Sequence, residues 1–269
     1  IAALAGVLAI GQGIVPYCVQ ILITGFGWRD AALYTGAAYL LILFPLVFLL
    51  REAPAAHAAG PMRGSESNLW GVPHAITIPW LAFAGLFCCV CMAVPLVHLV
   101  PLGIDLGCSP QVAAGLLLSL MSAGVAGRLF FGWLPDRIGG LSAYFLASLA
   151  QTAFVFWFTQ TSSIALLFQL SVLFGFGFAG VMTCLLICAR EAAPLRLSGT
   201  AMAIVSTAGW IGMGLGSYQA GLFYDITASY LLSYANAAVA GIVNLMIVAA
   251  LFWYRRNRNL TPLVAATGA

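Results

Sequence analysis

The chain has 269 residues, of which 63% are hydrophobic and only 6% are charged, and its formal net charge of +3 comes from arginine alone. A soluble globular domain carries about 25% charged residues, so the composition excludes an ordinary soluble protein. The apolar runs are continuous and not alternating, which argues against a transmembrane β-barrel. The composition therefore indicates a helical membrane protein, in which the positive charge marks topology and not nucleic-acid binding.

Long apolar stretches predict the secondary structure. A hydrocarbon core about 30 Å thick needs about 20 apolar residues per helix, and lipid offers no partner for an open backbone, so such stretches must be helical. Eight stretches qualify, and they predict an all-α transmembrane bundle with helices over 4–26, 31–50, 76–101, 109–132, 141–159, 163–188, 197–223 and 229–253.

One long connection divides the chain. Residues 52–75 are rich in proline, glycine and serine, which predicts a flexible linker. The linker separates two helices within residues 1–51 from six helices within residues 76–254. Residues 255–269 begin with a group of arginines and continue with small residues, so we expect them to form a tail without regular structure.

The arginines predict the orientation. If the predicted helices cross the membrane alternately, one side receives nine of the ten arginines and the other receives only Arg29, together with Asp30, Asp105 and Asp225. Arginine accumulates in cytoplasmic loops. The linker, the C-terminal tail and residue 1 are therefore expected to be cytoplasmic.

A short polar segment follows the fourth predicted helix. It reads Gly132-x-x-x-Asp136-Arg137-x-Gly139, and it resembles the signature loop of the major facilitator superfamily of membrane transporters. The resemblance implies that these four residues form a conformational latch, in which charge and helix-dipole contacts hold the cytoplasmic side closed. In the family, basic residues usually follow the second glycine of this loop. Here Gly139 is followed by Gly140 and Leu141, so the match is partial. A plain solvated turn is the alternative.

The arrangement of the whole chain resembles the same family. Two helices, a long linker and six helices are similar to the last eight of the twelve helices of a major facilitator protein, so the first four are expected to be missing from this sequence. Segments 11–16, 98–107 and 221–230 resemble bacterial carriers related to monocarboxylate and oxalate/formate transporters. The resemblance implies a secondary transporter in a bacterial inner membrane.

Arg128 is the first candidate substrate-binding residue. A guanidinium inside a membrane helix is costly and usually faces the bundle interior or a wet cavity, and its planar fork suits a carboxylate. In monocarboxylate transporters an arginine four residues before the loop glycine helps to bind the anion. Those transporters also carry an aspartate four residues earlier, where this chain has Gly124. Alternatively, Arg128 extends to the cytoplasm or pairs with Asp136.

His98 is the second candidate. It is the one histidine within a predicted span, and because imidazole titrates near neutral pH it could bind a proton or an anion. The alternative is a structural histidine that bonds to a neighbouring backbone group.

Three glycines on one predicted helix are candidate packing residues. Gly209, Gly212 and Gly216 lie on a single helix, and Gly212-x-x-x-Gly216 places two of them on one face. Small residues allow membrane helices to approach closely. Such a face serves either static packing or sliding between conformations.

The predicted function is transport. We expect a small organic anion, such as a mono- or dicarboxylate, to be moved by alternating access through proton symport or exchange. An exporter of hydrophobic compounds and a non-transporting sensor are the alternatives. We expect a monomer in membrane lipid, no enzymatic activity, no cofactor and no nucleic acid. We also expect no metal, because the run of Cys88, Cys89 and Cys91 has no second spaced pair.

Overall fold

The computed structural model describes residues 2–49, 70 and 72–267, and every regular element in these residues is helical. Three short helical segments, α5 (Pro135–Ile138), η1 (Phe156–Thr159) and η2 (Leu195–Leu197), lie between longer ones. The long helices correspond to the eight predicted stretches: α1 (Ala2–Phe26), α2 (Trp28–Leu49), α3 (His74–Asp105), α4 (Pro110–Trp133), α6 (Gly140–Val155), α7 (Ile164–Ala192), α8 (Ser198–Thr227) and α9 (Leu231–Thr267).

Five helices in the described part of the chain are long and apolar enough to cross a membrane. They cover His74–Asp105, Pro110–Ile138, Gly140–Thr159, Ile164–Ala192 and Leu231–Asn257. The predicted spans 4–26, 31–50 and 197–223 are not in this group. Within the described residues, Ile14–Phe26 counts only as a shorter apolar helix, and 197–223 forms the long helix α8. Glycine, serine and threonine make up much of α8 and lower its hydropathy, so its place inside the bundle comes from packing against other helices.

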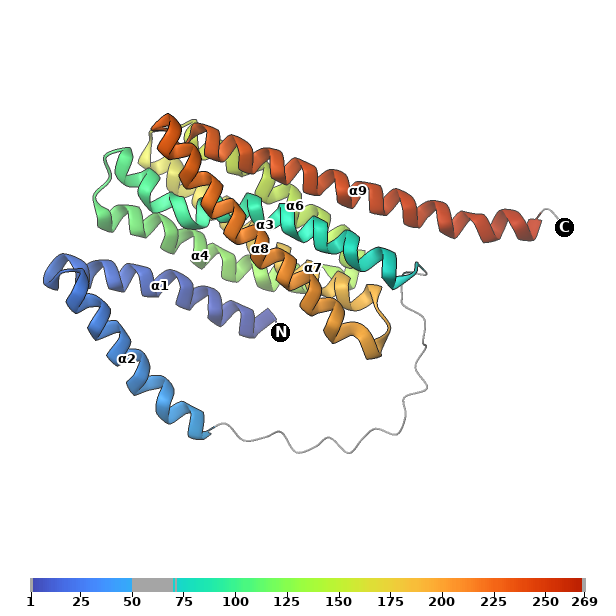
Figure 1. Cartoon of the computed structure of the whole chain (residues 1–269), viewed down its shortest axis with the longest axis horizontal. Helices are drawn as coiled ribbons and strands as arrows, with labels where there is room; N and C mark the ends of the chain where they lie inside the picture. Colours follow the sequence, from blue (N-terminus) through green and yellow to red (C-terminus); the bar gives the residue numbers. More distant parts are fainter. Residues whose placement is uncertain (1, 50–69, 71, 268–269) are drawn as a thin grey trace.

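Helices α3 to α9 form one bundle around α3 (Figure 1), which packs against α4, α6, α7, α8 and α9. Helix α4 packs against α7 on one side and against α1 on another. Gln111 at the start of α4 donates a hydrogen bond of 3.0 Å to the hydroxyl of Thr24 near the end of α1. The pair of helices α1 and α2 is therefore attached to the bundle through the contact between α1 and α4.

The two ends of the bundle differ in charge. At the arginine-rich end, α3 begins and α4 and α7 end, close to Arg137, Arg190 and Arg196. At the acidic end, α3 and α8 end close to Asp105 and Asp225.

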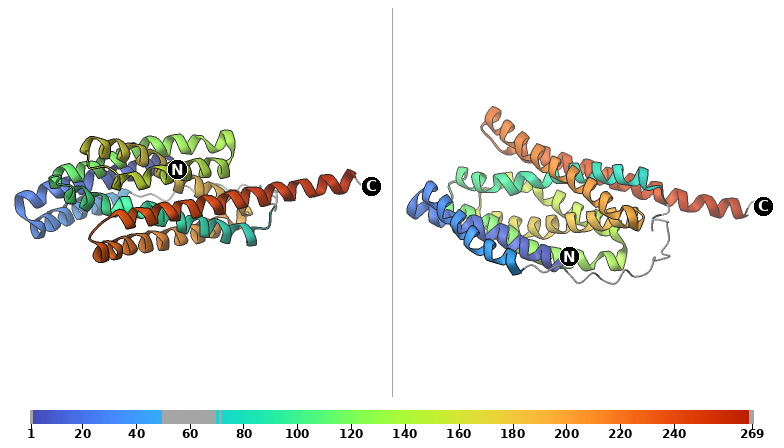
Figure 2. Two further views of the ribbon diagram at one scale, coloured as in Figure 1. Left: turned by 90° about the horizontal axis from the view of Figure 1, so that it is seen from above. Right: turned by 60° about the horizontal axis from the view of Figure 1, so that its bottom comes forward.

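Two expectations about the connections need comment. Helix α9 continues to Thr267 and projects beyond the bundle (Figures 1 and 2), so the expectation of an unstructured tail over 255–269 is wrong for these residues. Arginine is a good helix former, and its appearance marks the end of the apolar run but not the end of the helix. Most of the predicted linker 52–75 lies outside the described residues. Its described end contains the buried residues Trp70 and Val72.

Helices α3 and α8 touch at the three predicted glycines. A Cβ atom on Gly212 would collide with the carbonyl oxygen of Leu86, and one on Gly216 would lie 2.7 Å from the carbonyl oxygen of Val90. Gly209 faces the sulfur of Cys89. The two backbones are therefore in direct contact along this face, whether the face is static or slides.

Candidate functional site

The signature-like loop lies at the arginine-rich end. Gly139 has φ 84° and ψ 152°, a conformation that a side chain disfavours, and it makes the turn from α5 into α6. Asp136 is exposed in the first turn of α5. The guanidinium of Arg137 lies 5.1 Å from the ring centre of Trp133, one turn earlier in the chain, and Gly132 precedes that tryptophan. The latch function remains a prediction.

A second group of residues contacts Gly140, the residue that follows this loop. The indole Nε1 of Trp70 donates a 3.0 Å hydrogen bond to Oε2 of Glu191, and the guanidinium of Arg255 lies 4.4 Å from the Trp70 ring centre. The Glu191 carboxylate packs against Gly140, the first residue of α6. This Trp70 cluster joins the segment before α3 to α6, α7 and α9. Sequence reasoning did not identify Trp70, because a lone tryptophan beside a predicted linker indicates only an interfacial residue.

Arg128 lies on α4, about one turn before the loop, and its side chain is half-buried. The preceding residue, Gly127, has no room for a Cβ atom because the carbonyl of Phe176 on α7 occupies that space. The guanidinium therefore projects from a helix whose backbone is held tightly against α7. This support limits how far α4 can tilt or rotate to reposition the charge.

The structure explains why this chain has no aspartate four residues before Arg128. A Cβ atom on Gly124 would lie 3.2 Å from Cβ of Ala179 and 3.5 Å from the carbonyl oxygen of Gly175. An aspartate would need to place three more atoms in this space. Position 124 is therefore a helix-packing position, and a paired Asp–Arg switch cannot form here without separating α4 from α7.

His98 belongs to a polar cluster at the acidic end. Its Nε2 atom lies 3.1 Å from the carbonyl oxygen of Ser217 on α8. Because a carbonyl oxygen only accepts hydrogen bonds, Nε2 carries the proton, and Nδ1 of the neutral ring keeps its lone pair. The ring centre lies 5.6 Å from that of Tyr230.

Tyrosines extend this His98 cluster to the end of α3. Tyr230 stacks on Tyr224 with ring centres 4.3 Å apart, and the Tyr224 hydroxyl donates a 2.7 Å hydrogen bond to Oδ2 of Asp105. Burial, together with the nearby Asp105 and Asp225 carboxylates, raises the pKa of Tyr230 to about 12. Tyr230 therefore stays neutral at physiological pH. The segments around Asp105 and Asp225 marked a family resemblance in the sequence, but only the fold shows that they converge on His98.

The structure does not bring Arg128 and His98 together. His98 lies seven residues before the end of α3, or about 10 Å from the acidic end, whereas Arg128 lies eighteen residues into α4, or about 27 Å from that end. Their separation along the bundle axis is therefore about 15 Å or more. A small carboxylate cannot contact both residues at once.

The sequence model of the Major Facilitator Superfamily matches residues 1–217. The chain belongs to the major facilitator superfamily. This membership and the apolar helices make it an integral membrane protein of a transporter family and not an enzyme, and they confirm the resemblance found in the signature-like loop.

Two curated relatives refine the comparison of this major facilitator chain. It is 26% identical over 229 residues to the "Uncharacterized MFS-type transporter YcxA" of Bacillus subtilis (strain 168), covering 79% of this chain and 54% of the relative. It is 30% identical over 158 residues to "Monocarboxylate transporter 12-B" of Danio rerio, covering 48% of this chain and 33% of the relative. The major facilitator chain thus spans about half or less of the length of these relatives.

Proposed function

We propose that this chain acts in a secondary transporter that moves a small organic anion, such as a mono- or dicarboxylate, by alternating access. Family membership supports transport. Similarity to a relative named as a monocarboxylate transporter supports an organic anion. The observation that carries the proposal is Arg128, a half-buried guanidinium within a helix apolar enough to cross a membrane.

Arg128 suits an anion site for physical reasons. A cation at this depth in a membrane helix is retained when it faces the interior or a wet path. Its planar fork donates two parallel hydrogen bonds to a carboxylate. The tight contact of Gly127 with α7 supports the helix beneath it, so the guanidinium is preorganised for an anion that approaches between the two halves of the transporter.

We assign His98 a different role on the same path. Its Nε2 is already engaged with the Ser217 carbonyl, so a direct anion contact requires that bond to break or the ring to be protonated. Protonation at Nδ1 leaves the bond to Ser217 intact, so a proton can bind to His98 before any anion does. His98 is therefore better suited to bind the coupling proton than to hold the substrate, and proton symport follows as the favoured coupling.

We further propose that the arginine-rich end faces the cytoplasm of a bacterial inner membrane, because arginine is retained on that side. In this orientation Gly132, Asp136, Arg137 and Gly139 lie where a cytoplasmic latch acts. The exposure of Asp136 supports this role, since an exposed carboxylate can reach a group on the opposite half when the cytoplasmic side closes.

Uptake of radiolabelled carboxylates into liposomes that contain the full-length gene product tests the proposal, with and without a pH gradient. Arg128→Ala should raise the KM about 10- to 100-fold, because a charge-assisted hydrogen bond contributes about 1.5–3 kcal/mol. Arg196→Ala, which removes an exposed arginine at the arginine-rich end, is the matched control and should leave the KM unchanged. Equal uptake by the wild type and Arg128→Ala would return Arg128 to a structural role.

A further inference from the structure

Five polar side chains meet inside the bundle, between α3, α6 and α9. Cys88 lies on α3, Asn244 lies on α9, and one face of α6 carries Tyr144, Ser148 and Gln151. All five side chains are buried, with exposed fractions of 0%. The Cys88 sulfur lies beside the hydroxyls of Tyr144 and Ser148 and beside the Gln151 amide. The Tyr144 hydroxyl also donates a 2.9 Å hydrogen bond to Oδ1 of Asn244, so these side chains form one group, the Cys88 cluster.

Three atoms of the Cys88 cluster have no hydrogen-bond partner among the described residues. They are Ser148 Oγ, Gln151 Oε1 and Asn244 Nδ2. The other half of the Gln151 amide is fully used, because its Nε2 donates to the carbonyl oxygen and to the sulfur of Cys88, each at 3.2 Å. A buried polar atom that leaves water without gaining a partner destabilises the fold, and such atoms are rare in native proteins. Three of them in one cluster therefore indicate a bound polar ligand.

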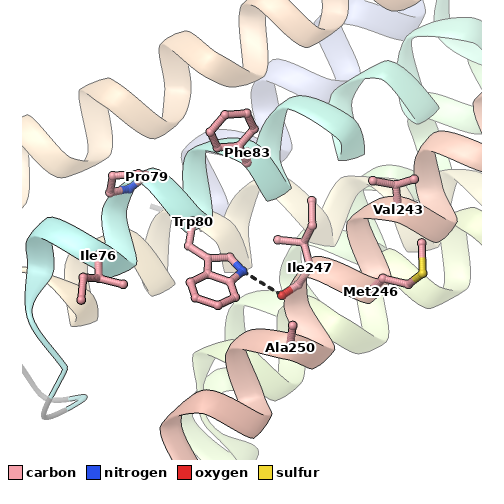
Figure 3. Close-up of a pocket in the computed structure, with 8 residues that line it drawn as sticks. All are labelled: Ile76, Pro79, Trp80, Phe83, Val243, Met246, Ile247 and Ala250. Atoms are coloured by element: carbon pink, nitrogen blue, oxygen red, sulfur yellow. Dashed lines mark hydrogen bonds between the residues drawn. The ribbon is translucent and has the colours of Figure 1, made fainter.

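The surroundings of the Cys88 cluster do not supply the missing partners. Its three helices belong to segments apolar enough to cross a membrane, and hydrocarbon offers no hydrogen bond. Near the cluster, residues 76–83 of α3 and 243–250 of α9 line the α3–α9 groove (Figure 3), in which every lining side chain is apolar or aromatic. The indole Nε1 of Trp80, the one side-chain N–H donor among the lining residues, already donates a 3.0 Å hydrogen bond to the Ile247 carbonyl. Because the cluster has no exposed surface, chain segments outside the described residues cannot reach it either.

We propose that the Cys88 cluster binds one water molecule, which accepts a hydrogen bond from Asn244 Nδ2 and donates to Gln151 Oε1 and Ser148 Oγ. Water suits this set because it both donates and accepts, and a buried water typically makes about three hydrogen bonds. A metal cation would be repelled by the Asn244 N–H group and would find no carboxylate in the cluster. The water joins α6 to α9 and, through Gln151 and Cys88, to α3. This role is independent of which solute the transporter carries.

The sign of one substitution tests the proposal. If Ser148 Oγ binds the water, Ser148→Ala removes a hydrogen bond and should lower the melting temperature of the full-length gene product. If the hydroxyl is unpaired, the same change removes a desolvated polar atom and should raise the melting temperature.

Ser171→Ala is the matched control for this substitution. Ser171 is equally buried, on α7, and its Oγ donates a 2.8 Å hydrogen bond to the Leu167 carbonyl of its own helix, so its loss leaves no unpaired group. Both variants gain the same helix preference of alanine, and their difference therefore reports the partner of the Ser148 hydroxyl. A melting temperature of Ser148→Ala equal to or above that of Ser171→Ala would overturn the proposal.

A direct measurement uses the wild type and so does not depend on the stability of any variant. In proton-detected solid-state NMR of the full-length gene product in lipid bilayers, magnetisation should pass from water to the side-chain amide protons of Asn244. Asn244→Leu assigns this signal by removing it. An Asn244 amide that receives no magnetisation from water, or a crystal structure in which Ser148, Gln151 and Asn244 pair directly with one another, would also overturn the proposal.

Discussion

Replacing Gly212 with alanine should force α3 and α8 apart. The added Cβ atom would collide with the carbonyl oxygen of Leu86 and lie 3.1 Å from Cβ of Cys89. A helical carbonyl cannot rotate away without losing its own hydrogen bond, so the whole helix must shift. Gly214→Ala is the matched control, because it adds the same atom to the same helix with nothing within 4 Å.

The pair of variants isolates the packing cost. Overpacking by one carbon costs about 1–3 kcal/mol, whereas alanine is favoured over glycine inside a helix by about 1 kcal/mol. Gly212→Ala should therefore destabilise the protein by up to about 2 kcal/mol, and Gly214→Ala should be neutral or stabilising. Because the helix preference is common to both variants, their difference of about 1–3 kcal/mol reports the contact with α3 alone.

Thermal unfolding in detergent, followed with a thiol-reactive dye, measures this difference. Six of the seven cysteines are buried, so unfolding exposes many new thiols. Cys89 lies on the face of α3 that meets α8, so Gly212→Ala should also speed the labelling of Cys89 below the melting temperature. Identical melting temperatures for Gly212→Ala and Gly214→Ala would refute the conclusion that the two backbones are in contact at this position.

Three further predictions concern other contacts. Gly139→Ala should destabilise the turn after α5 by about 1–3 kcal/mol, because its backbone conformation is nearly restricted to glycine; an unchanged melting temperature would show that the turn tolerates a side chain. Tyr144→Phe removes a buried 2.9 Å hydrogen bond to Asn244 and should cost about 1 kcal/mol; a double-mutant cycle with Asn244→Leu should show coupling, and additive effects would contradict it. Trp70→Phe removes the donor to Glu191 and should cost about 1 kcal/mol, measured by the same thiol assay; Glu191→Gln in the Trp70→Phe background should then add little.

Arg128 and His98 show which features of a site could be predicted from the sequence and which could not. Arg128 and His98 were both predicted to contact the substrate, and each prediction followed from one residue in one helix. The predicted spans 76–101 and 109–132 already put His98 toward one end of the bundle and Arg128 toward the other, and the observed helix ends give the size of the separation. His98 also meets Ser217 and Tyr230, which lie more than one hundred residues later in the chain. No local pattern indicates such a contact.

Gly124 is a second position where the sequence shows the residue but not the contacts that surround it. The sequence shows that an aspartate is absent at this position, but it does not show the reason. The structure shows that α7 occupies the space that an aspartate would need. An aspartate at position 124 is therefore incompatible with the close packing of α4 against α7.

The sequence by itself determined the class of protein, the number of long helices and the turn at Gly139. Membrane physics makes these features local, because a span needs a continuous apolar run and a turn needs its own residues. Only the tertiary structure decided which helices are neighbours, and so where the Trp70 cluster, the His98 cluster and the α3–α9 groove form. The physical reason is that these helices are apolar on most of their surface, so hydrophobic periodicity does not distinguish the face that meets protein from the face that meets lipid.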